Sequence, residues 1–152
     1  MTCIVGFVEN NKVWMGGDSC ASNYNSWVQI GNPKVFQVGE FLIGVCGSMR
    51  MMDLLAFELV GCVQRPEDPD DKFARTTFIN AVKQCFKEGN FGKEDEGGNF
   101  LLGYRGTLYE IQSDFSVVKC PGWGMAIGSG GDVARGSLWT LDNTFKNQNF
   151  WN

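Results

Sequence analysis

Three side chains near the start of the sequence, Thr2, Asp18 and Lys34, are of the types needed for nucleophilic catalysis. A threonine hydroxyl is a weak nucleophile until a base accepts its proton, and an N-terminal amine on the same residue can be that base. Residue 2 is small, so we expect Met1 to be removed and Thr2 to carry a free α-amine. The pKa of a model α-amine is about 7.7–8.0, near the pH at which such a base works.

Lys34 and Asp18 are suited to tune this amine. A lysine ammonium beside the amine would lower the amine's pKa, because like charges oppose protonation. A carboxylate would in turn keep the lysine charged and in place. Each residue alone also has an ordinary explanation, since Asp18 follows two glycines in a turn-like segment and Lys34 could be a solvated surface lysine. The joint occurrence of the three residues is what indicates catalysis.

The residues between Thr2 and Asp18 predict a β-hairpin. Residues 3–8 and 13–17 are apolar and β-prone, and the polar residues 9–12 separate them as a turn. Such a hairpin returns Asp18 to the start of the chain, beside Thr2. The nearly continuous apolar run at 41–46 is typical of a buried central strand.

The rest of the sequence predicts an α+β fold. Ser48 is the expected N-cap of a helix whose apolar stripe continues to Cys62, and a second helix is expected over 72–88. Residues 21–32 are expected to form an irregular loop and then a strand. Further strands are expected at 34–38, 99–104, 107–111 and 116–119, with a third helix from about Asp132.

Three segments together resemble the opening of proteasome β-subunits and of the bacterial peptidase HslV, which are N-terminal-nucleophile (Ntn) hydrolases with a catalytic threonine. The intervals of 16 and 32 residues from Thr2 to Asp18 and to Lys34 match that family's pattern. The resemblance implies one Ntn-hydrolase domain over residues 1–152, with a four-layer α-β-β-α sandwich and threonine peptidase activity of a small bacterial or phage type. The segments are Thr2-Cys3-Ile4-Val5-Gly6, Gly16-Gly17-Asp18-Ser19 and Pro33-Lys34-Val35-Phe36.

The same resemblance implies roles for Gly47 and Ser129. Gly47 lies at the predicted strand-to-helix junction, within one residue of the place where a glycine of the family donates its backbone N–H to the oxyanion. Glycine allows close backbone approach and a helix N-terminus favours negative charge, although a tight turn would also explain this glycine. Ser129 matches the serine that helps relay the proton of the threonine amine. The glycines around it lack the lysine ending of a phosphate-binding loop, so we do not expect nucleotide binding.

Composition excludes several classes of function. A net charge of −4 and a pI near 4.8 argue against a nucleic-acid partner. The sequence has no apolar stretch of membrane-spanning length and no signal-peptide pattern, so no membrane partner and a cytoplasmic location are expected. The six cysteines form no CxxC pair and are interpreted as small buried hydrophobes. The absence of histidine excludes Ser-His-Asp catalysis and histidine metal sites, and no cofactor or metal is expected.

Assembly is a further implication of the resemblance. It implies a peptide or protein substrate, a homo-oligomeric ring that encloses the threonines, and an unfoldase as a partner. The family continues past the last helix with another helix and strands, so we expect a sheet without its last strand and exposed apolar surface, including Phe145, Phe150 and Trp151. Two other functions remain open, namely an inactive structural subunit with the same fold and an amidase on small amides.

Overall fold

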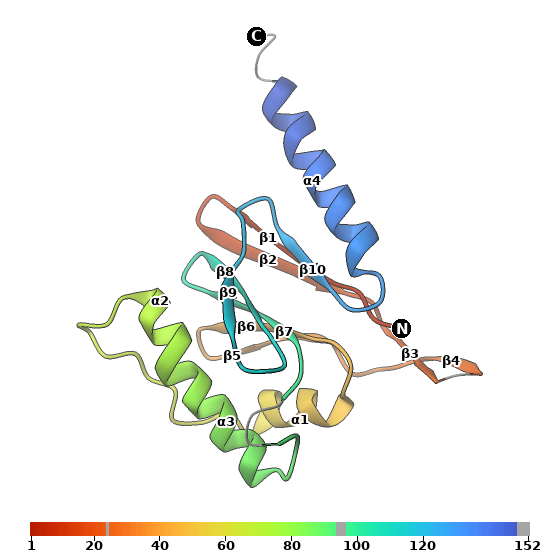
Figure 1. Cartoon of the computed structure of the whole chain (residues 1–152). Coiled ribbons are helices and arrows are strands. Elements are labelled where there is room, and N and C mark those ends of the chain that lie inside the picture. The colour runs from red at the N-terminus through yellow and green to blue at the C-terminus, as the bar shows by residue number, and fades with distance from the viewer. Residues whose placement is uncertain (24, 94–96, 149–152) are drawn as a thin grey trace.

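The computed structural model describes residues 1–23, 25–93 and 97–148, which form an α+β fold (Figure 1). The strands of these residues lie in three antiparallel sheets. A three-stranded sheet of order β10-β1-β2 contains β1 (Ile4–Glu9), β2 (Lys12–Gly17) and β10 (Met125–Ile127). A two-stranded sheet contains β3 (Cys20–Asn23) and β4 (Ser26–Gln29). A five-stranded sheet contains, in spatial order, β5 (Val35–Val38), β6 (Phe41–Val45), β7 (Phe100–Tyr104), β8 (Thr107–Ile111) and β9 (Val117–Lys119).

Helical residues of the described ranges form three groups. The first is α1 (Met49–Phe57), and the last is α4 (Gly131–Gln148). Between them α2 (Asp70–Phe73), the π-helical turn η1 (Ala74–Phe78) and α3 (Ile79–Glu88) follow one another without a break. No helix of the described ranges is long and apolar enough to cross a membrane.

The predicted first hairpin is confirmed. Ile4 of β1 pairs with Gly17 of β2, and the turn is made by Asn10 and Asn11 with φ of 50° and 58°. Asparagine tolerates this left-handed conformation better than most residues, and two such residues match the twist of a hairpin. The hairpin returns the chain to its start, where the Asp18 N–H donates to the Cys3 carbonyl at 3.2 Å.

The five-stranded sheet has apolar cores on both faces. All five residues of β7 are buried, as expected for a strand covered on both sides. Phe100 and its alternate residues pack against α1 and α3, while Leu101 packs with Ile4 between the two larger sheets. A Cβ on Gly44 would lie 2.5 Å from Ile4 Cγ2, so the two sheets are in close contact there. Helix α4 contacts β10 and β1, and Figure 1 shows it on the side opposite to α1 and α3.

Several boundaries differ from the sequence-based expectation. Helix α1 ends at Phe57 rather than continuing to Cys62, because β-branched Val60 and left-handed Gly61 (φ 73°) do not favour helix. The second helical segment starts at Asp70 rather than residue 72. Residues 21–32 form most of the β3–β4 hairpin rather than a loop and a single strand.

All six cysteines are free thiols, and two of them, Cys85 and Cys120, are buried. Of the predicted apolar C-terminal residues, Phe150, Trp151 and the side chain of Phe145 lie outside the described residues.

Candidate active site

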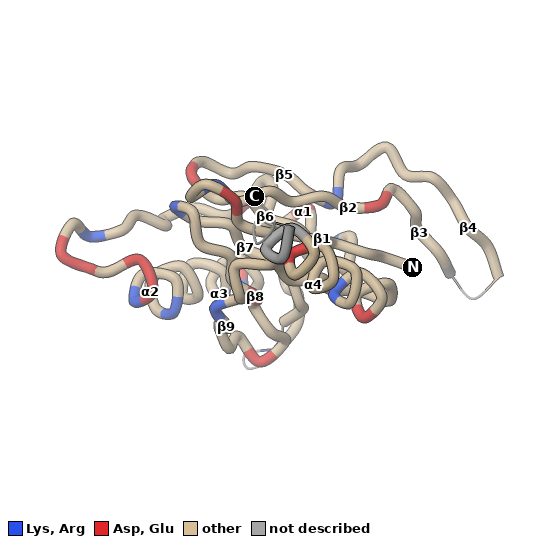
Figure 2. Tube along the Cα trace, turned by 90° about the horizontal axis from the view of Figure 1, so that it is seen from above, with Lys and Arg blue, Asp and Glu red and all other residues tan. Residues whose placement is uncertain are grey.

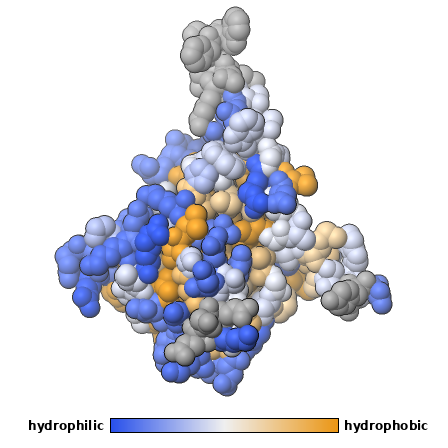
Figure 3. Space-filling view, viewed as in Figure 1, coloured by the Kyte–Doolittle hydropathy of each residue, from blue (hydrophilic) through white to orange (hydrophobic). Residues whose placement is uncertain are grey.

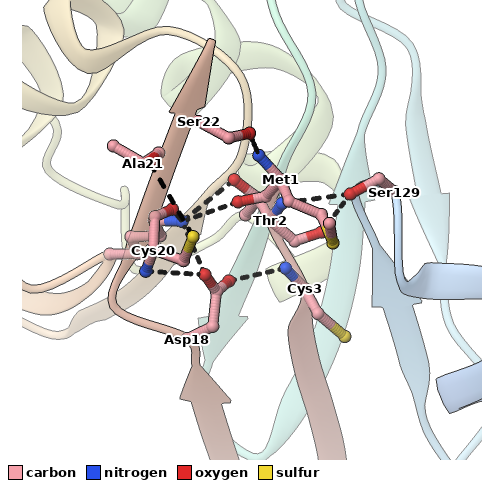
Figure 4. Close-up of polar contacts among 9 residues, drawn as sticks. Met1, Thr2, Cys3, Asp18, Cys20, Ala21, Ser22 and Ser129 are labelled. Carbon is pink, nitrogen blue, oxygen red and sulfur yellow. Dashed lines mark hydrogen bonds and ion pairs between the residues drawn. The ribbon is translucent and has the colours of Figure 1, made fainter. Parts of the chain in front are cut away.

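Thr2, Asp18 and Lys34 lie together, close to the ends of three strands. Figure 4 shows Thr2 and Asp18 with their other polar partners. Lys34 Nζ is 3.0 Å from Thr2 Oγ1 and 2.9 Å from Asp18 Oδ2. Thr2 precedes β1, Asp18 follows β2, and Lys34 precedes β5. The β1–β2 hairpin therefore places the hydroxyl and the carboxylate, and the start of the five-stranded sheet places the ammonium between them.

The Lys34 ammonium is held at a fixed position. Its side chain is only 6% exposed, and Nζ also donates to the Cys20 carbonyl at 2.5 Å and to the Met1 carbonyl at 3.3 Å. A charge removed from water is costly unless it is paired and hydrogen-bonded. The carboxylate of Asp18 and the surrounding oxygens meet that requirement, and they hold Lys34 Nζ beside the Thr2 hydroxyl.

Asp18 is stabilised as a carboxylate. Burial raises its pKa, but hydrogen bonds from the Cys3 N–H, the Lys34 ammonium and the Cys20 N–H outweigh burial and hold the pKa below its usual value. The Cys3 N–H donates to Oδ1 at 2.7 Å and the Cys20 N–H to Oδ2 at 2.9 Å. One carboxylate thus joins the start of β1, the start of β3 and the lysine.

Ser129 contacts Thr2 from the opposite side. The Thr2 N–H donates to Ser129 Oγ at 3.1 Å, and the serine hydroxyl donates to the Thr2 carbonyl at 3.3 Å. The Gly130 N–H donates to the same carbonyl at 3.2 Å. Gly128 has a φ of 91°, and a Cβ there would overlap the Thr2 carbonyl. Only glycine at position 128 lets this loop pack directly on the Thr2 backbone.

A cavity of about 140 Å³ lies beside Thr2, and Gly47 is part of its wall. Gly47 has a φ of 89° and links β6 to α1, whose first turn is capped by Ser48. The Ser48 hydroxyl accepts the Met51 N–H at 3.2 Å, which confirms the predicted N-cap. The cavity is lined by Met1, Thr2, Cys20, Ala21, Ser22, Lys34, Val45, Cys46, Gly47, Ser48, Met49 and Met52.

The structure adds groups that the sequence did not indicate. The Cys20 carbonyl binds Lys34, and the Met1 ammonium donates to the Ser22 hydroxyl (Figure 4). The two acceptors, the Cys20 carbonyl and the Ser22 hydroxyl, belong to β3, whose pairing with β4 has no strong sequence signal. A backbone carbonyl cannot be recognised as an acceptor from its residue type. Only a prediction of the β3–β4 hairpin would have placed these two groups at the site.

Lys34 provides the one charged side chain of the cavity wall among the described residues. Burial raises the pKa of the Cys46 thiol, which donates to the Asn99 carbonyl at 3.5 Å. A thiol in this state is a poor nucleophile compared with its thiolate. The described ranges contain no group of three or more His, Cys, Asp or Glu side chains placed to hold a metal ion.

No protein-family model matches this sequence, and no curated protein matches it. Solved structures do match the fold. BPH of Thiobacillus denitrificans, in complex with epoxomicin, matches with a TM-score of 0.73 at 15% identity, over 91% of this chain and 78% of that chain. The chain has a proteasome-like fold.

Two Anbu structures share the proteasome-like fold with lower scores. A Gly-1 mutant from Hyphomicrobium sp. strain MC1 matches with a TM-score of 0.57 at 17% identity, over 85% of this chain and 61% of that chain. Anbu from Yersinia bercovieri, described as an ancestral β-subunit, matches with a TM-score of 0.51 at 12% identity, over 86% of this chain and 61% of that chain. At sequence identities of 12–17%, these matches establish a shared fold and nothing about activity.

Proposed function

We propose that this chain is a threonine-type Ntn hydrolase that cleaves peptide bonds. The observation that carries the proposal is the Lys34 ammonium, which joins the Thr2 hydroxyl to the Asp18 carboxylate at the edge of a cavity. In this proposal the Thr2 hydroxyl is the nucleophile and its α-amine, freed by removal of Met1, is the base. Lys34 lowers the pKa of that amine, and Asp18 keeps Lys34 charged and oriented.

The reaction proceeds through an ester on Thr2. The amine accepts the Oγ1 proton as Oγ1 bonds to the scissile carbonyl carbon, and the Gly47 N–H donates to the resulting oxyanion. The C–N bond then breaks and the proton passes to the leaving amine, with Ser129 as the relay. Water, activated by the same amine, hydrolyses the ester and restores the Thr2 hydroxyl.

Removal of Met1 is the condition for this chemistry. With Met1 attached, the Thr2 nitrogen is an amide that donates to Ser129, and it has no basic lone pair. Met1 is exposed, so a processing enzyme can reach it. A chain that keeps Met1 retains only the scaffold, which is the alternative function of an inactive structural subunit.

The cavity favours substrates with a neutral side chain next to the scissile bond. Its wall combines apolar side chains such as Val45 and Met52 with hydroxyls, and Lys34, its one charged side chain among the described residues, is already bonded to Asp18. A cavity of about 150 Å³ lined by apolar groups accommodates benzene. The volume of about 140 Å³ has room for an aliphatic or phenyl group, and removal of Met1, which is part of the wall, would enlarge it. An amidase on small amides would use the same reacting atoms but leave this space empty.

We extend the proposal to architecture and assembly. Helix α4 on one side of the paired sheets, with α1 and α3 on the other, supports a four-layer α-β-β-α sandwich in a single domain. The description of the Yersinia protein as a β-subunit supports a homo-oligomeric ring, which an unfoldase would supply with protein substrate. Six free cysteines favour a reducing compartment such as the cytoplasm.

Hydrolysis of fluorogenic peptides tests the proposal. Intact-mass measurement first establishes that Met1 is absent from the sample. The wild type should then cleave peptides with Leu or Phe before the fluorophore, whereas Thr2→Ala should lose activity by ~10³-fold or more. Thr2→Ser, which keeps a hydroxyl, is the matched control and should retain part of it. Epoxomicin should add its mass once to the wild type and not to Thr2→Ala.

Two outcomes would reject the enzymatic proposal. Hydrolysis that persists in Thr2→Ala would show that another group, or a contaminant, is the catalyst. Complete retention of Met1 in protein isolated from its natural source would instead support the structural subunit.

A further inference from the structure

A second cavity, of about 420 Å³, shares no lining residue with the cavity beside Thr2. Its wall is formed by side chains between positions 80 and 93, from α3 and the loop after it, and by Phe115 from the loop between β8 and β9. We call this cavity the α3 pocket. Pockets for small ligands typically have volumes of about 300–1,000 Å³. The α3 pocket is therefore large enough for a small molecule, and the proposed peptide hydrolysis uses none of its residues.

Three phenylalanine rings form the apolar part of the α3 pocket. Phe86 and Phe115 are 2% and 7% exposed, and their ring centroids are 6.1 Å apart. The Phe91 ring meets the Phe86 ring edge-on, with the centroids 5.0 Å apart. A Cβ on Gly97 would lie 2.9 Å from the Phe115 ring and 3.0 Å from the Phe86 ring, so both rings are closely packed there. Fixed rings of this kind favour contact with another aromatic group.

The backbone at Phe115 supports this interpretation. Phe115 has a φ of 65°, a left-handed conformation that is uncommon for a bulky residue. Its N–H donates to the Gln112 carbonyl at 2.9 Å, and the Gln112 N–H donates to the Ser116 carbonyl at 2.9 Å, so a tight turn imposes the conformation. Residues held in such conformations cluster at ligand-binding and active sites. Here the turn presents the Phe115 ring to the pocket.

The charge of the α3 pocket differs from that of the whole chain. Lys83, Lys87 and Lys93 line it, whereas no Asp or Glu does so among the described residues. Over the whole sequence acidic residues outnumber basic ones by 17 to 13, and Figure 2 shows the two signs interspersed along the chain. The acidic residues at 94–96 lie outside the described residues. In Figure 3 the surface at the lower end of the molecule, where α3 ends, is mostly hydrophilic, so the aromatic rings lie beneath a polar rim.

The helix itself explains only part of this arrangement. Lys87 is in the last turn of α3, where a cation interacts favourably with the helix dipole. Lys83 is one turn earlier, and its Nζ lies 5.1 Å from the centroid of the Phe115 ring. Like charges four residues apart on a helix repel each other. Neither lysine forms an ion pair with a carboxylate of the described residues. A bound anion would offset the repulsion between them.

We propose that the α3 pocket binds a small planar aromatic anion, of the class of aryl phosphates and aryl carboxylates. The aromatic ring contacts the phenylalanine rings, and the anionic group pairs with Lys83 and Lys87. Asn80 and Asn90 also line the pocket and provide neutral hydrogen-bonding groups, whereas the Gln84 amide already donates to Glu88 at 2.7 Å. A cavity of about 150 Å³ holds one benzene molecule. A volume of about 420 Å³ therefore has room for a two-ring group with its anionic substituent.

Titration with naphthyl phosphate, followed by heteronuclear NMR of the backbone amides, tests the proposal. The amides of Gln84 and Gly92, which line the pocket, should shift saturably, with a Kd on the order of 0.1–1 mM. Naphthol lacks the charge and inorganic phosphate lacks the ring, so each should bind at least ~10-fold more weakly. Higher salt should also weaken the binding of naphthyl phosphate, because an exposed ion pair is screened.

A matched pair of lysine variants tests the role of the charge. Lys83→Gln should weaken the binding of naphthyl phosphate by ~3-fold or more, because it removes one cation of the pocket and its contact with the Phe115 ring. Lys12→Gln makes the same change at an exposed residue of β2 outside the pocket, and it should bind like the wild type. Circular dichroism verifies that both variants are folded.

Each of four results would overturn the proposal. These are the absence of saturable shifts at millimolar naphthyl phosphate, shifts confined to residues around Thr2, an unchanged affinity in Lys83→Gln, and equally tight binding of naphthol or inorganic phosphate. Binding is read from amide shifts and not from hydrolysis. Thr2→Ala should therefore bind naphthyl phosphate like the wild type, and the result is independent of the enzymatic proposal.

Discussion

Replacing Lys34 with methionine should both destabilise the fold and shift the pH dependence of hydrolysis. Methionine keeps an apolar side chain of similar length but removes the ammonium that is bonded to Asp18, Thr2 and Cys20. Removing one partner of a fully buried ion pair costs about 3–5 kcal/mol. Asp18 is 31% exposed and keeps two backbone N–H donors, so water replaces part of the loss. We expect unfolding free energy to fall by about 2 kcal/mol.

The kinetic effect has a definite sign. Without the neighbouring positive charge, the Thr2 amine gains a proton more easily, and its pKa should rise by ~1 unit or more. At neutral pH roughly tenfold less of the free base is then present. The rate should therefore fall at pH 7 and recover as pH is raised, a response that a purely structural lysine would not produce.

Urea unfolding and pH–rate profiles measure the two effects. The double variant Lys34→Met/Asp18→Asn should be little less stable than Lys34→Met alone, because Asp18 has already lost its charged partner. Additive losses would show that the two side chains are not coupled. A folded Lys34→Met enzyme with an unshifted pH–rate profile would refute the role assigned to the ammonium.

Three further predictions concern stability. Gly44→Ala should lower the free energy of unfolding by about 1–3 kcal/mol, because the new Cβ would lie 2.5 Å from Ile4 Cγ2. Gly16→Ala is the control and should be tolerated, since the nearest atom to its Cβ is 3.8 Å away. Urea unfolding midpoints compare the two variants. Ser48→Ala should cost ~1 kcal/mol through the lost cap of α1, read from thermal melting. The pKa of Asp71 is lowered, above all by a hydrogen bond from the Tyr109 hydroxyl. The ionised carboxylate therefore stabilises the fold fully above its unfolded pKa of about 3.9, and this contribution is lost as pH falls through the lower folded pKa. Asp71→Asn should reduce the change in unfolding free energy measured between pH 5 and 2.

The first hairpin was predictable because its signals are local. Alternating apolar residues flank a polar turn, and the strands register so that Asp18 returns beside Cys3. Once that register is known, Thr2 and Asp18 must be neighbours. The positions of Lys34 and Ser129 could not be predicted from such local signals, because they depend on contacts between segments that are far apart in the sequence. Their proximity to Thr2 was expected from the family resemblance, and the hydrogen bonds now support it.

Other features were beyond local signals. Strand β3 contains Cys, Ser and Asn, which have little β preference, so the sequence did not mark it as the partner of β4. The spacing of apolar residues predicted that the first helix would continue to Cys62, but Gly61 adopts a positive φ and α1 ends at Phe57. The π-helical turn at Ala74–Phe78 has no residue signature; Phe73 just before it and Phe78 at its end are both buried in the core.

The contacts around Met1 have a practical consequence for producing this protein. The Met1 ammonium donates to Ser22, and its carbonyl accepts from Lys34, so the chain start lies in the cavity itself. An affinity tag fused before Met1 would replace the ammonium that donates to Ser22 with an amide, and it would leave Thr2 acylated. Helix α4, by contrast, runs away from the sheets toward its C-terminal end (Figure 1). A purification handle belongs after that helix, where it leaves both the processing of Met1 and the cavity undisturbed.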